Sequence, residues 1–317
     1  MAPILNVAVP AGTAMTLSKS SSGGHSAALT GIAYMLGAVF LFGVNSATGK
    51  WLVAKYPVGE FLVLRSGVTL LLLSPFIWRA GMTAFRAAPR RGLQVLRVLL
   101  AAAEVAMFFW AVQYLPLADA QTFYLAGPIY VTALSVLLLG ERVGWRRWSA
   151  VLVGFCGVVV ALRPSSASLT LPAVIALSGS VIYAFLMIAT RVLRQTDDTV
   201  LMATQFAGIF VLSAFAAPFG WITPTPYDVL ALLLLGFASV LSLFCVVRAL
   251  KLASASVVVP YQYTLIVWSV LFGWLIFAEW PDLNTVVGAA IIIGAGLYIF
   301  WRERVTASGV SPAPEPQ

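Results

Sequence analysis

Hydrophobic residues occur in ten long runs separated by short polar connections. The runs lie near residues 28–53, 59–79, 93–115, 117–140, 145–163, 171–191, 199–220, 227–249, 254–278 and 283–302. Most contain about 20 residues, the length at which an α-helix crosses about 30 Å of hydrocarbon. The pattern therefore predicts an all-α integral membrane protein with ten transmembrane helices.

The runs divide into two sets of five, over residues 28–163 and 171–302, joined by a linker at 164–170. Each helix reverses the direction of the chain, so an odd number per set inverts the second set relative to the first. Inverted repeats around a midplane cavity are typical of secondary transporters. The flanking segments 1–27 and 303–317 are poor in large apolar residues and are predicted to be disordered tails.

Composition agrees with a lipid environment, because 61% of the residues are hydrophobic and 9% are charged, whereas soluble domains carry about 25% charged residues. With cytoplasmic termini, fifteen Lys and Arg residues fall on the inner side and three, Lys50, Lys55 and Arg163, on the outer side. Inner loops of membrane proteins are rich in Lys and Arg. We therefore expect both termini in the cytoplasm and the chain in the cell (inner) membrane. The net charge of +8 is a topology signal and not a nucleic-acid-binding surface.

Weak internal similarity supports the repeat. An offset of 141 residues aligns Lys50 with Arg191 and Gly67 with Gly208, and an offset of 138 aligns Glu141 with Glu279. Each glutamate ends an apolar run, and a glycine-containing helix follows it. The shared helix order and the repeated terminal glutamate are better evidence than the single identities.

The segments LLLGERVGWRRWSAVLVGFCGVVVAL and LIFAEWPDLNTVVGAAIIIGAGLYI, one in each half, resemble the EamA-type repeats of the drug/metabolite transporter superfamily. The segment AVQYLPLADAQTFYLAGPIY is similar to the entry of that family's fourth helix. The resemblance covers about residues 28–302. It implies export of amino acids or other metabolites, and the overall pattern is similar to the YddG-type amino-acid exporters.

Glu104 lies near the middle of the third predicted helix, where a charge costs at least about 2.5 kcal/mol. It is expected to face protein or water. Two interpretations remain open: a structural ion pair with Arg65 of the second helix, or a site for proton coupling or a substrate amine. Arg65 is also a candidate for binding a substrate carboxylate, since a guanidinium binds carboxylates bidentately.

Two polar-aromatic clusters enter the membrane from opposite sides. The first contains Gln121, Thr122 and Tyr124, and the second contains Pro260, Tyr261, Gln262 and Tyr263. The 138-residue offset aligns Tyr124 with Gln262, so both clusters are expected at the midplane, where inverted-repeat transporters bind substrate. Pro128 and Pro260 are predicted to break their helices and free backbone carbonyls. Ordinary packing of the tyrosines is the alternative.

Further candidates for the cavity are Asn45 and the aromatic residues Trp110, Tyr183 and Trp268. Asn45 either bonds a neighbouring helix or lines the cavity. Lys50, near the outer end of the first helix, is expected to extend towards the interface. Glu141 and Glu279 are interpreted as loop-ordering or helix-capping groups.

The sequence contains one histidine, His25, and two cysteines, Cys156 and Cys245, which are far apart within apolar runs. A His/Cys metal site, a cofactor and an enzyme active site are therefore not expected. The leading hypothesis is a secondary transporter that exports amino acids or related small metabolites by alternating access, with the lipid bilayer and a small-molecule substrate as partners and protons as a candidate coupling ion. The alternatives are efflux of aromatic or cationic compounds and, less favoured, an intramembrane enzyme.

Overall fold

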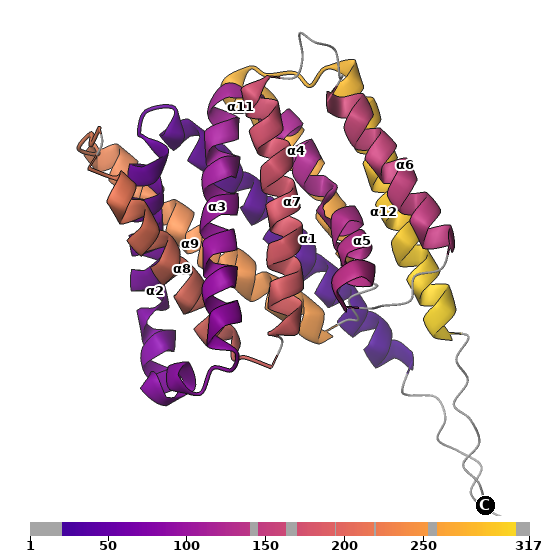
Figure 1. Ribbon diagram of the computed structural model, residues 1–317, viewed down its shortest axis with the longest axis horizontal. Helices are drawn as coiled ribbons and strands as arrows, with labels where there is room; N and C mark the ends of the chain where they lie inside the picture. Colours follow the sequence, from indigo (N-terminus) through magenta and orange to yellow (C-terminus); the bar gives the residue numbers. More distant parts are fainter. Residues whose placement is uncertain are drawn as a thin grey trace, which may run out of the picture.

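A computed structural model describes residues 21–139, 145–162, 170–193, 195–218, 220–252 and 259–308. These residues form α-helices and one 3-10 helix (Figure 1). The elements are α1 (Ser21–Val53), α2 (Val58–Arg86), α3 (Arg91–Tyr114), α4 (Leu117–Leu125), α5 (Gly127–Leu139), α6 (Trp145–Leu162), α7 (Leu171–Val192), α8 (Asp198–Ala216), α9 (Pro226–Leu252), η1 (Val259–Thr264), α11 (Leu265–Phe277) and α12 (Leu283–Ser308). Since α4 with α5 and η1 with α11 each form one broken span, the described residues contain the ten predicted spans.

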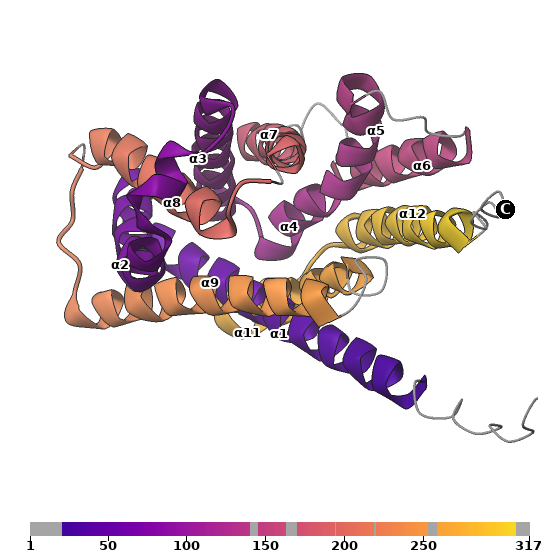
Figure 2. The ribbon, with the colours of Figure 1, turned by 90° about the horizontal axis from the view of Figure 1, so that it is seen from below.

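The helices pack as expected of two inverted halves. Exchanging the two halves replaces α1 by α7 and α9 by α3. The contact between α1 and α9 therefore has a counterpart, the contact between α7 and α3, and both are present. The same exchange swaps α2 with α8 and α6 with α12, and the two helices of each of these pairs also pack together. Seen along the helices, α3 and α7 lie on one long side, α1 and α9 on the other, and α6 and α12 close one end (Figure 2). The packing is thus that of an inverted repeat with a pseudo-two-fold axis.

The two broken spans are interrupted at equivalent positions. The first break is at Ala126, between α4 and α5, and the second is at Thr264, the last residue of η1. These positions differ by 138 residues, the offset that aligns the two glutamates. Pro128 lies in the first turn of α5 and has no backbone N–H with which to continue the hydrogen bonding of α4, which accounts for a new helix start at this point.

Three helix ends differ from the sequence prediction. The helix α1 begins at Ser21, inside the segment predicted to be a tail, because no proline lies between Pro10 and Pro57 to stop it. The helix α12 continues to Ser308. The helix α2 continues to Arg86 beyond a kink at Gly81, whose φ of 71° is accessible mainly to glycine. Hydropathy marks the membrane-spanning part of a helix and misses polar extensions.

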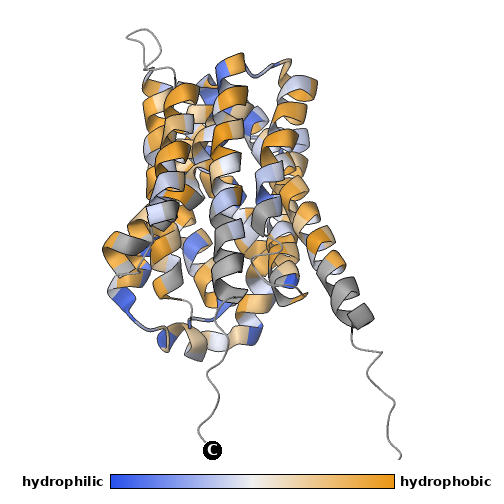
Figure 3. Ribbon diagram, turned by 90° about the vertical axis from the view of Figure 1, so that its right-hand side faces the viewer, coloured by the Kyte–Doolittle hydropathy of each residue, from blue (hydrophilic) through white to orange (hydrophobic). Residues whose placement is uncertain are grey.

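The outward faces of the helices are apolar over most of their length (Figure 3). Six described helices are each long and apolar enough to cross a membrane, and shorter apolar stretches occur in α6, in η1 with α11, and in α12. Large apolar side chains are exposed on these helices, for example Leu71, Phe215 and Leu234. Lipid is the environment in which such a surface is stable.

A close contact between α6 and α12 gives a test of the packing. A Cβ atom added at Gly288 would lie 2.7 Å from the carbonyl oxygen of Gly157, whereas one added at Gly294 of the same helix would meet nothing within 4 Å. We expect Gly288→Ala to lower the melting temperature in detergent, because overpacking costs about 1–3 kcal/mol. The matched Gly294→Ala is expected to leave it unchanged or raise it by helix propensity. Equal effects of the two substitutions would contradict this packing.

Candidate functional site

A cavity of about 490 Å³ lies between the two halves. Its lining comes from α1, α2, α3, α4, α7, α8, α9, η1 and α11, so both halves and both broken spans contribute. Aromatic and aliphatic side chains form much of the wall. The polar lining residues are Asn45, Ser46, Arg65, Glu104, Gln121, Tyr124, Tyr183, Gln205, Ser239, Gln262 and Tyr263. Apolar walls with a few converging polar groups are typical of small-molecule sites.

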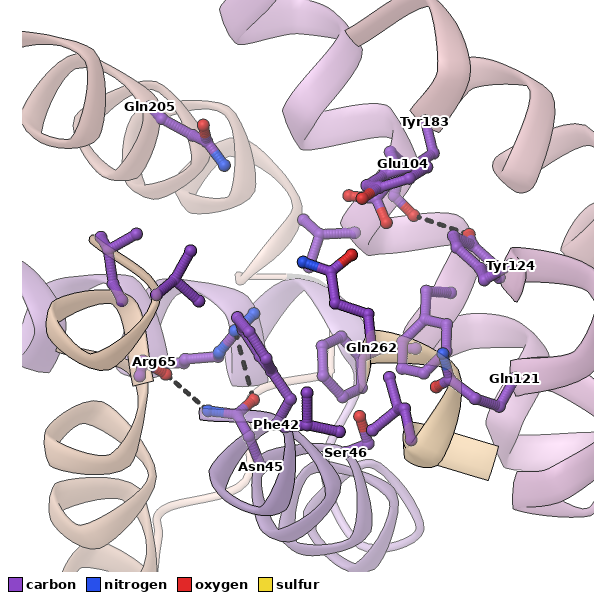
Figure 4. Close-up of a pocket in the computed structure, with 18 of the residues that line it drawn as sticks. Phe42, Asn45, Ser46, Arg65, Glu104, Gln121, Tyr124, Tyr183, Gln205 and Gln262 are labelled. Carbon is purple, nitrogen blue, oxygen red and sulfur yellow. Dashed lines mark hydrogen bonds between the residues drawn. The ribbon is translucent and has the colours of Figure 1, made fainter. Parts of the chain in front are cut away.

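Arg65 of α2 forms one polar side of the cavity (Figure 4). Its Nη2 atom donates to the side-chain oxygen of Asn45 at 3.3 Å, and its guanidinium lies 5.2 Å from the centre of the Phe109 ring. Its Nε atom is buried and has no hydrogen-bond partner among the described residues. The guanidinium is therefore held in place with donor capacity to spare for a ligand.

Asn45 connects three helices as well as lining the cavity. Its side-chain nitrogen donates to the backbone oxygen of Leu235 at 3.2 Å and to the hydroxyl of Ser239 at 2.5 Å, both on α9. Its oxygen accepts from Arg65. The two sequence interpretations of Asn45 are thus both realised, and the amide fixes α1 and α2 against α9.

Glu104 of α3 lies on another side of the cavity, beside Tyr183 and Tyr124 (Figure 4). The hydroxyl of Tyr124 donates to the backbone oxygen of Glu104 at 3.3 Å. Within the described residues, the carboxylate forms no ion pair with Arg65, so of the two interpretations left open by the sequence the structural ion pair is the one that the geometry contradicts. Both groups line the cavity, Arg65 from α2 and Glu104 from α3, so the two charges face the same space without meeting.

The first helix break positions the aromatic wall beside Glu104. Tyr124 packs edge-on against Phe108, with ring centres 5.0 Å apart, and lies 6.3 Å from the Tyr183 ring. A Cβ atom at Gly127 would lie 2.9 Å from the Tyr183 ring, so the glycine at the break leaves room for that ring. Gln121 lines the cavity one turn earlier on α4, and Gln262 and Tyr263 enter from η1.

Four other predicted positions lie outside the cavity lining. Thr122 is fully buried and donates to the backbone oxygen of Ala118. Trp110 packs on Tyr114, Trp268 packs on Phe40 and Phe272, and Tyr261 packs against the cluster of Met35, Val39 and Ala249. Each helix in a bundle presents only one side to a central space, and these residues lie on the others. The side chains of Pro128 and Pro260 are outside the described part.

Lys50 does not extend to the interface, and that expectation is wrong. It is 7% exposed, and its Nζ atom lies 2.5 Å and 2.7 Å from the two carboxylate oxygens of Glu279. The same atom donates to the backbone oxygen of Leu115 at 2.8 Å, and Glu279 accepts from the backbone nitrogen of Leu117 at 3.0 Å. Glu279 thus joins the end of α11 to α1 and to the first residue of α4, which agrees with a loop-ordering or capping role and adds an ion pair to it. Glu141 lies outside the described residues.

The contacts of Lys50 and Glu279 lie at the end of the bundle opposite to the start of α1 and the end of α12, and we call this end the far side. A second polar cluster lies on the far side. Asp228 accepts from the Tyr56 hydroxyl at 2.7 Å and pairs with Lys55 at 3.0 Å, and Thr225 also donates to it. Glu60 accepts from the backbone nitrogen of Ile222 at 2.9 Å. Burial, with the Asp228 hydrogen bond, raises the pKa of Tyr56 above its usual value. These contacts join the α1–α2 connection to the α8–α9 connection.

No group of three or more His, Cys, Asp or Glu side chains with metal-site geometry occurs in the described part of the chain. The two cysteines, Cys156 and Cys245, are free.

The model of the EamA-like transporter family matches residues 29–163 and again residues 170–301. The chain belongs to this family. As an EamA-like protein it is a multi-pass membrane transporter of the drug/metabolite transporter superfamily, and the two matched ranges correspond to the two inverted halves of the fold.

Several curated members of the family are similar over nearly their whole length. An S-adenosylmethionine uptake transporter of Rickettsia prowazekii is 28% identical over 88% of this chain and 95% of that protein. The pseudopaline exporter CntI of Pseudomonas aeruginosa is 30% identical over 84% and 94%. A riboflavin transporter of Rhizobium johnstonii is 29% identical over 88% and 93%. A solved structure described only as a crystal structure of protein shares the fold, with a TM-score of 0.60, 18% identity and coverage of 89% and 99%.

Sequence reasoning missed several groups of this EamA-like site. The largest omission is Gln205 of α8, which lines the cavity. A polar amide inside an apolar run was the available signal. Phe108, Phe109 and Phe206 also line the wall, and nothing in their sequence positions separates them from aromatic residues that face lipid.

Cysteine labelling tests the cavity. In a background without Cys156 and Cys245, we expect cysteines at positions 121, 124 and 262 to react with a water-soluble maleimide, because Gln121, Tyr124 and Gln262 line the cavity. Position 261 is the matched control, since Tyr261 packs in a hydrophobic cluster and is expected to react several-fold more slowly. Reaction at 261 as fast as at 262 would show that η1 presents a different face to the cavity.

A double-mutant cycle tests the ion pair between Lys50 and Glu279. We expect Lys50→Met and Glu279→Gln each to lower the melting temperature, since each leaves a partly buried charge without its partner. The double variant should be less destabilised than the sum, with a coupling on the order of 1 kcal/mol. Lys55→Met is the control, because the Lys55 side chain is 43% exposed in its own ion pair and should contribute little. Strict additivity would exclude a working ion pair.

Proposed function

We propose that this EamA-like transporter exports amino acids, or metabolites that carry an amino-acid group, by alternating access through the central cavity. The observation that carries the proposal is that Arg65 and Glu104 line one cavity without pairing with each other. A zwitterionic group offers a carboxylate to the first and an ammonium to the second. Coupling to protons, with Glu104 as the carrier, belongs to the same proposal.

The energetic argument is that a charge away from water requires a partner. An unpaired ion in a low-dielectric interior costs several kcal/mol, of order 3–5 kcal/mol when one member of a pair is removed. In this proposal water hydrates both groups when no substrate is bound, and a bound amino-acid group replaces that water with fixed opposite charges. The cost of burying the two charges is then offset when substrate is bound, which favours selection of zwitterions.

The relatives are compatible with this class. S-adenosylmethionine, named for the Rickettsia relative, contains an amino-acid group that a sulfonium and a ribose connect to an aromatic base. The aromatic wall of Phe108, Phe109, Tyr124 and Tyr183 suits a planar or apolar remainder of the substrate. Riboflavin, named for another relative, has no amino-acid group. That relative and the aromatic wall favour a second candidate function, efflux of aromatic or cationic compounds, which would use Glu104 without Arg65.

Flux measurement in proteoliposomes tests the proposal. With a panel of labelled amino acids, S-adenosylmethionine and riboflavin, we expect saturable flux of at least one compound that carries an amino-acid group. Flux of riboflavin or of simple cations alone would favour the second candidate. Absence of substrate-dependent flux across the panel would contradict the first. The same vesicles, with a pH gradient imposed or removed, report whether protons are coupled.

Substitution of the two charges separates the candidates further. For a zwitterionic substrate we expect Arg65→Gln and Glu104→Gln each to raise KM by about 10- to 100-fold, since a hydrogen bond to a charged group contributes about 1.5–3 kcal/mol. A cationic aromatic compound should lose affinity only with Glu104→Gln. Ser46→Ala is a control that also lines the cavity but carries no charge. Unchanged KM in both charge variants would remove the basis of the proposal.

We infer that the ion pair between Lys50 and Glu279 and the Asp228 cluster, which both lie on the far side, keep that side of the cavity closed. With cytoplasmic termini the far side is the outer side, so alternating access requires these contacts to break when substrate is released. We expect Glu279→Gln to increase labelling of a cysteine at position 121 by a membrane-impermeant reagent added outside. If the cysteine at position 121 reacted only with reagent added inside, in the wild-type background and in Glu279→Gln alike, this orientation would be contradicted.

A further inference from the structure

Arg97 of α3 is 2% exposed, and its hydrogen bonds to described residues all go to one helix, α8. Its Nη1 atom donates to the side-chain oxygen of Gln205 at 2.9 Å. Its Nη2 atom donates to the backbone oxygen of Leu201 and to the hydroxyl of Thr204 at 3.3 Å. No described acid forms an ion pair with this arginine. The guanidinium therefore acts on α8 as a set of hydrogen-bond donors.

These contacts decide which way the Gln205 amide points. An arginine has donors and no acceptor, so the atom of Gln205 that faces Arg97 must be its oxygen. The NH₂ group then faces the other way, and Gln205 lines the cavity with its nitrogen on the side of the cavity interior (Figure 4). No described residue accepts a hydrogen bond from this nitrogen. The Gln205 amide thus presents two N–H donors to the cavity, and it cannot flip without losing its hydrogen bond from Arg97.

We propose that Gln205, held in this orientation by Arg97, donates a hydrogen bond to an acceptor atom on the part of the substrate that lies away from its amino-acid group. Gln205 is the substrate-contacting residue, and Arg97 is a positioning residue. The transporter then favours amino-acid derivatives that carry such an acceptor over plain apolar amino acids. This inference rests on the proposed function and names its substrate class more narrowly.

The arrangement of the cavity supports a third anchor. Arg65, Glu104 and Gln205 belong to α2, α3 and α8 and lie on separate sides of the cavity (Figure 4). An amino-acid group uses the first two. The volume of about 490 Å³ falls within the range of about 300–1,000 Å³ that holds drug-sized ligands, so space remains for a longer substrate. A plain apolar side chain entering that space would displace water from the amide without replacing its hydrogen bonds.

Competition against flux of the best-transported panel member tests the proposal. Methionine sulfone, O-acetylhomoserine and Nε-acetyllysine carry an acceptor at increasing distance from the amino-acid group, and each is compared with an apolar amino acid of similar length. For the wild-type chain we expect at least one acceptor compound to compete about 10-fold more strongly than its apolar match. Gln205→Glu keeps an acceptor for Arg97 but replaces the donor that faces the cavity, and it should abolish this preference while the protein stays folded.

Further variants separate positioning from a merely structural role. Arg97→Met frees the amide and is expected to reduce the preference, with maximal flux per folded protein retained, and Arg97→Lys should restore part of it. Thr204→Val removes another partner of Arg97 that does not line the cavity, and should leave the preference unchanged.

The outcomes are distinguishable. Equal competition by acceptor and apolar compounds in the wild-type chain, or an unchanged preference in Gln205→Glu, overturns the inference. The proposed function is unaffected by either result as long as the chain still transports a compound that carries an amino-acid group. A wild-type chain that moves no panel member that carries an amino-acid group overturns the proposed function and this inference with it.

Discussion

The absence of water inside a bilayer is the constraint on which this structure depends. Every polar group in a spanning segment must be satisfied by the protein or by a water-filled cavity. In this chain Asn45 uses its nitrogen on α9 and its oxygen on Arg65, and Arg97 donates to three acceptors on α8. Hydrogen bonds of buried polar side chains therefore help to fix which helices are neighbours, in addition to apolar packing. Arg65, whose Nε atom has no partner among the described residues, lines the cavity, where a ligand can reach its side chain.

The fold is nearly symmetric, but its chemistry is not. Helices pair as the exchange of halves requires, and the two helix breaks lie 138 residues apart. At the cavity wall, however, the offset of 141 that aligns Gly67 with Gly208 places Arg65 opposite Phe206, and both line the cavity. A symmetric cavity would offer the same group twice and suit a symmetric ligand. Divergence at equivalent positions gives it charged and aromatic sides, as an amphiphilic substrate requires.

The spans were predictable from sequence because hydropathy depends on composition over about 20 residues, which lipid selects directly. The contacts were not, because they depend on how helices far apart in the chain are rotated. Lys50 and Glu279 are 229 residues apart, and each alone is equally compatible with an interfacial or capping role. Inversion fixes the depth of the clusters on α4 and η1 but not the side that each residue faces: Gln121, Tyr124, Gln262 and Tyr263 line the cavity, whereas Thr122 and Tyr261 do not. Trp110 and Trp268 were not, because an aromatic side chain packs between helices as readily as it lines a cavity.

Alternating access, as proposed, requires the far side to close reversibly, and the energy of its contacts suits that requirement. Desolvation of two ions nearly cancels their attraction in many buried pairs, so the net stabilisation is small even though loss of one partner is costly. The pair of Lys50 and Glu279 lies in this regime, since the lysine side chain is 9% exposed and the glutamate side chain 26% exposed. Water that enters as the helices separate would rehydrate both ions and repay much of the lost attraction. An apolar contact of the same area has no such compensation, because its cost grows with every square ångström exposed. A polar closure can therefore specify one state of the transporter without preventing the other.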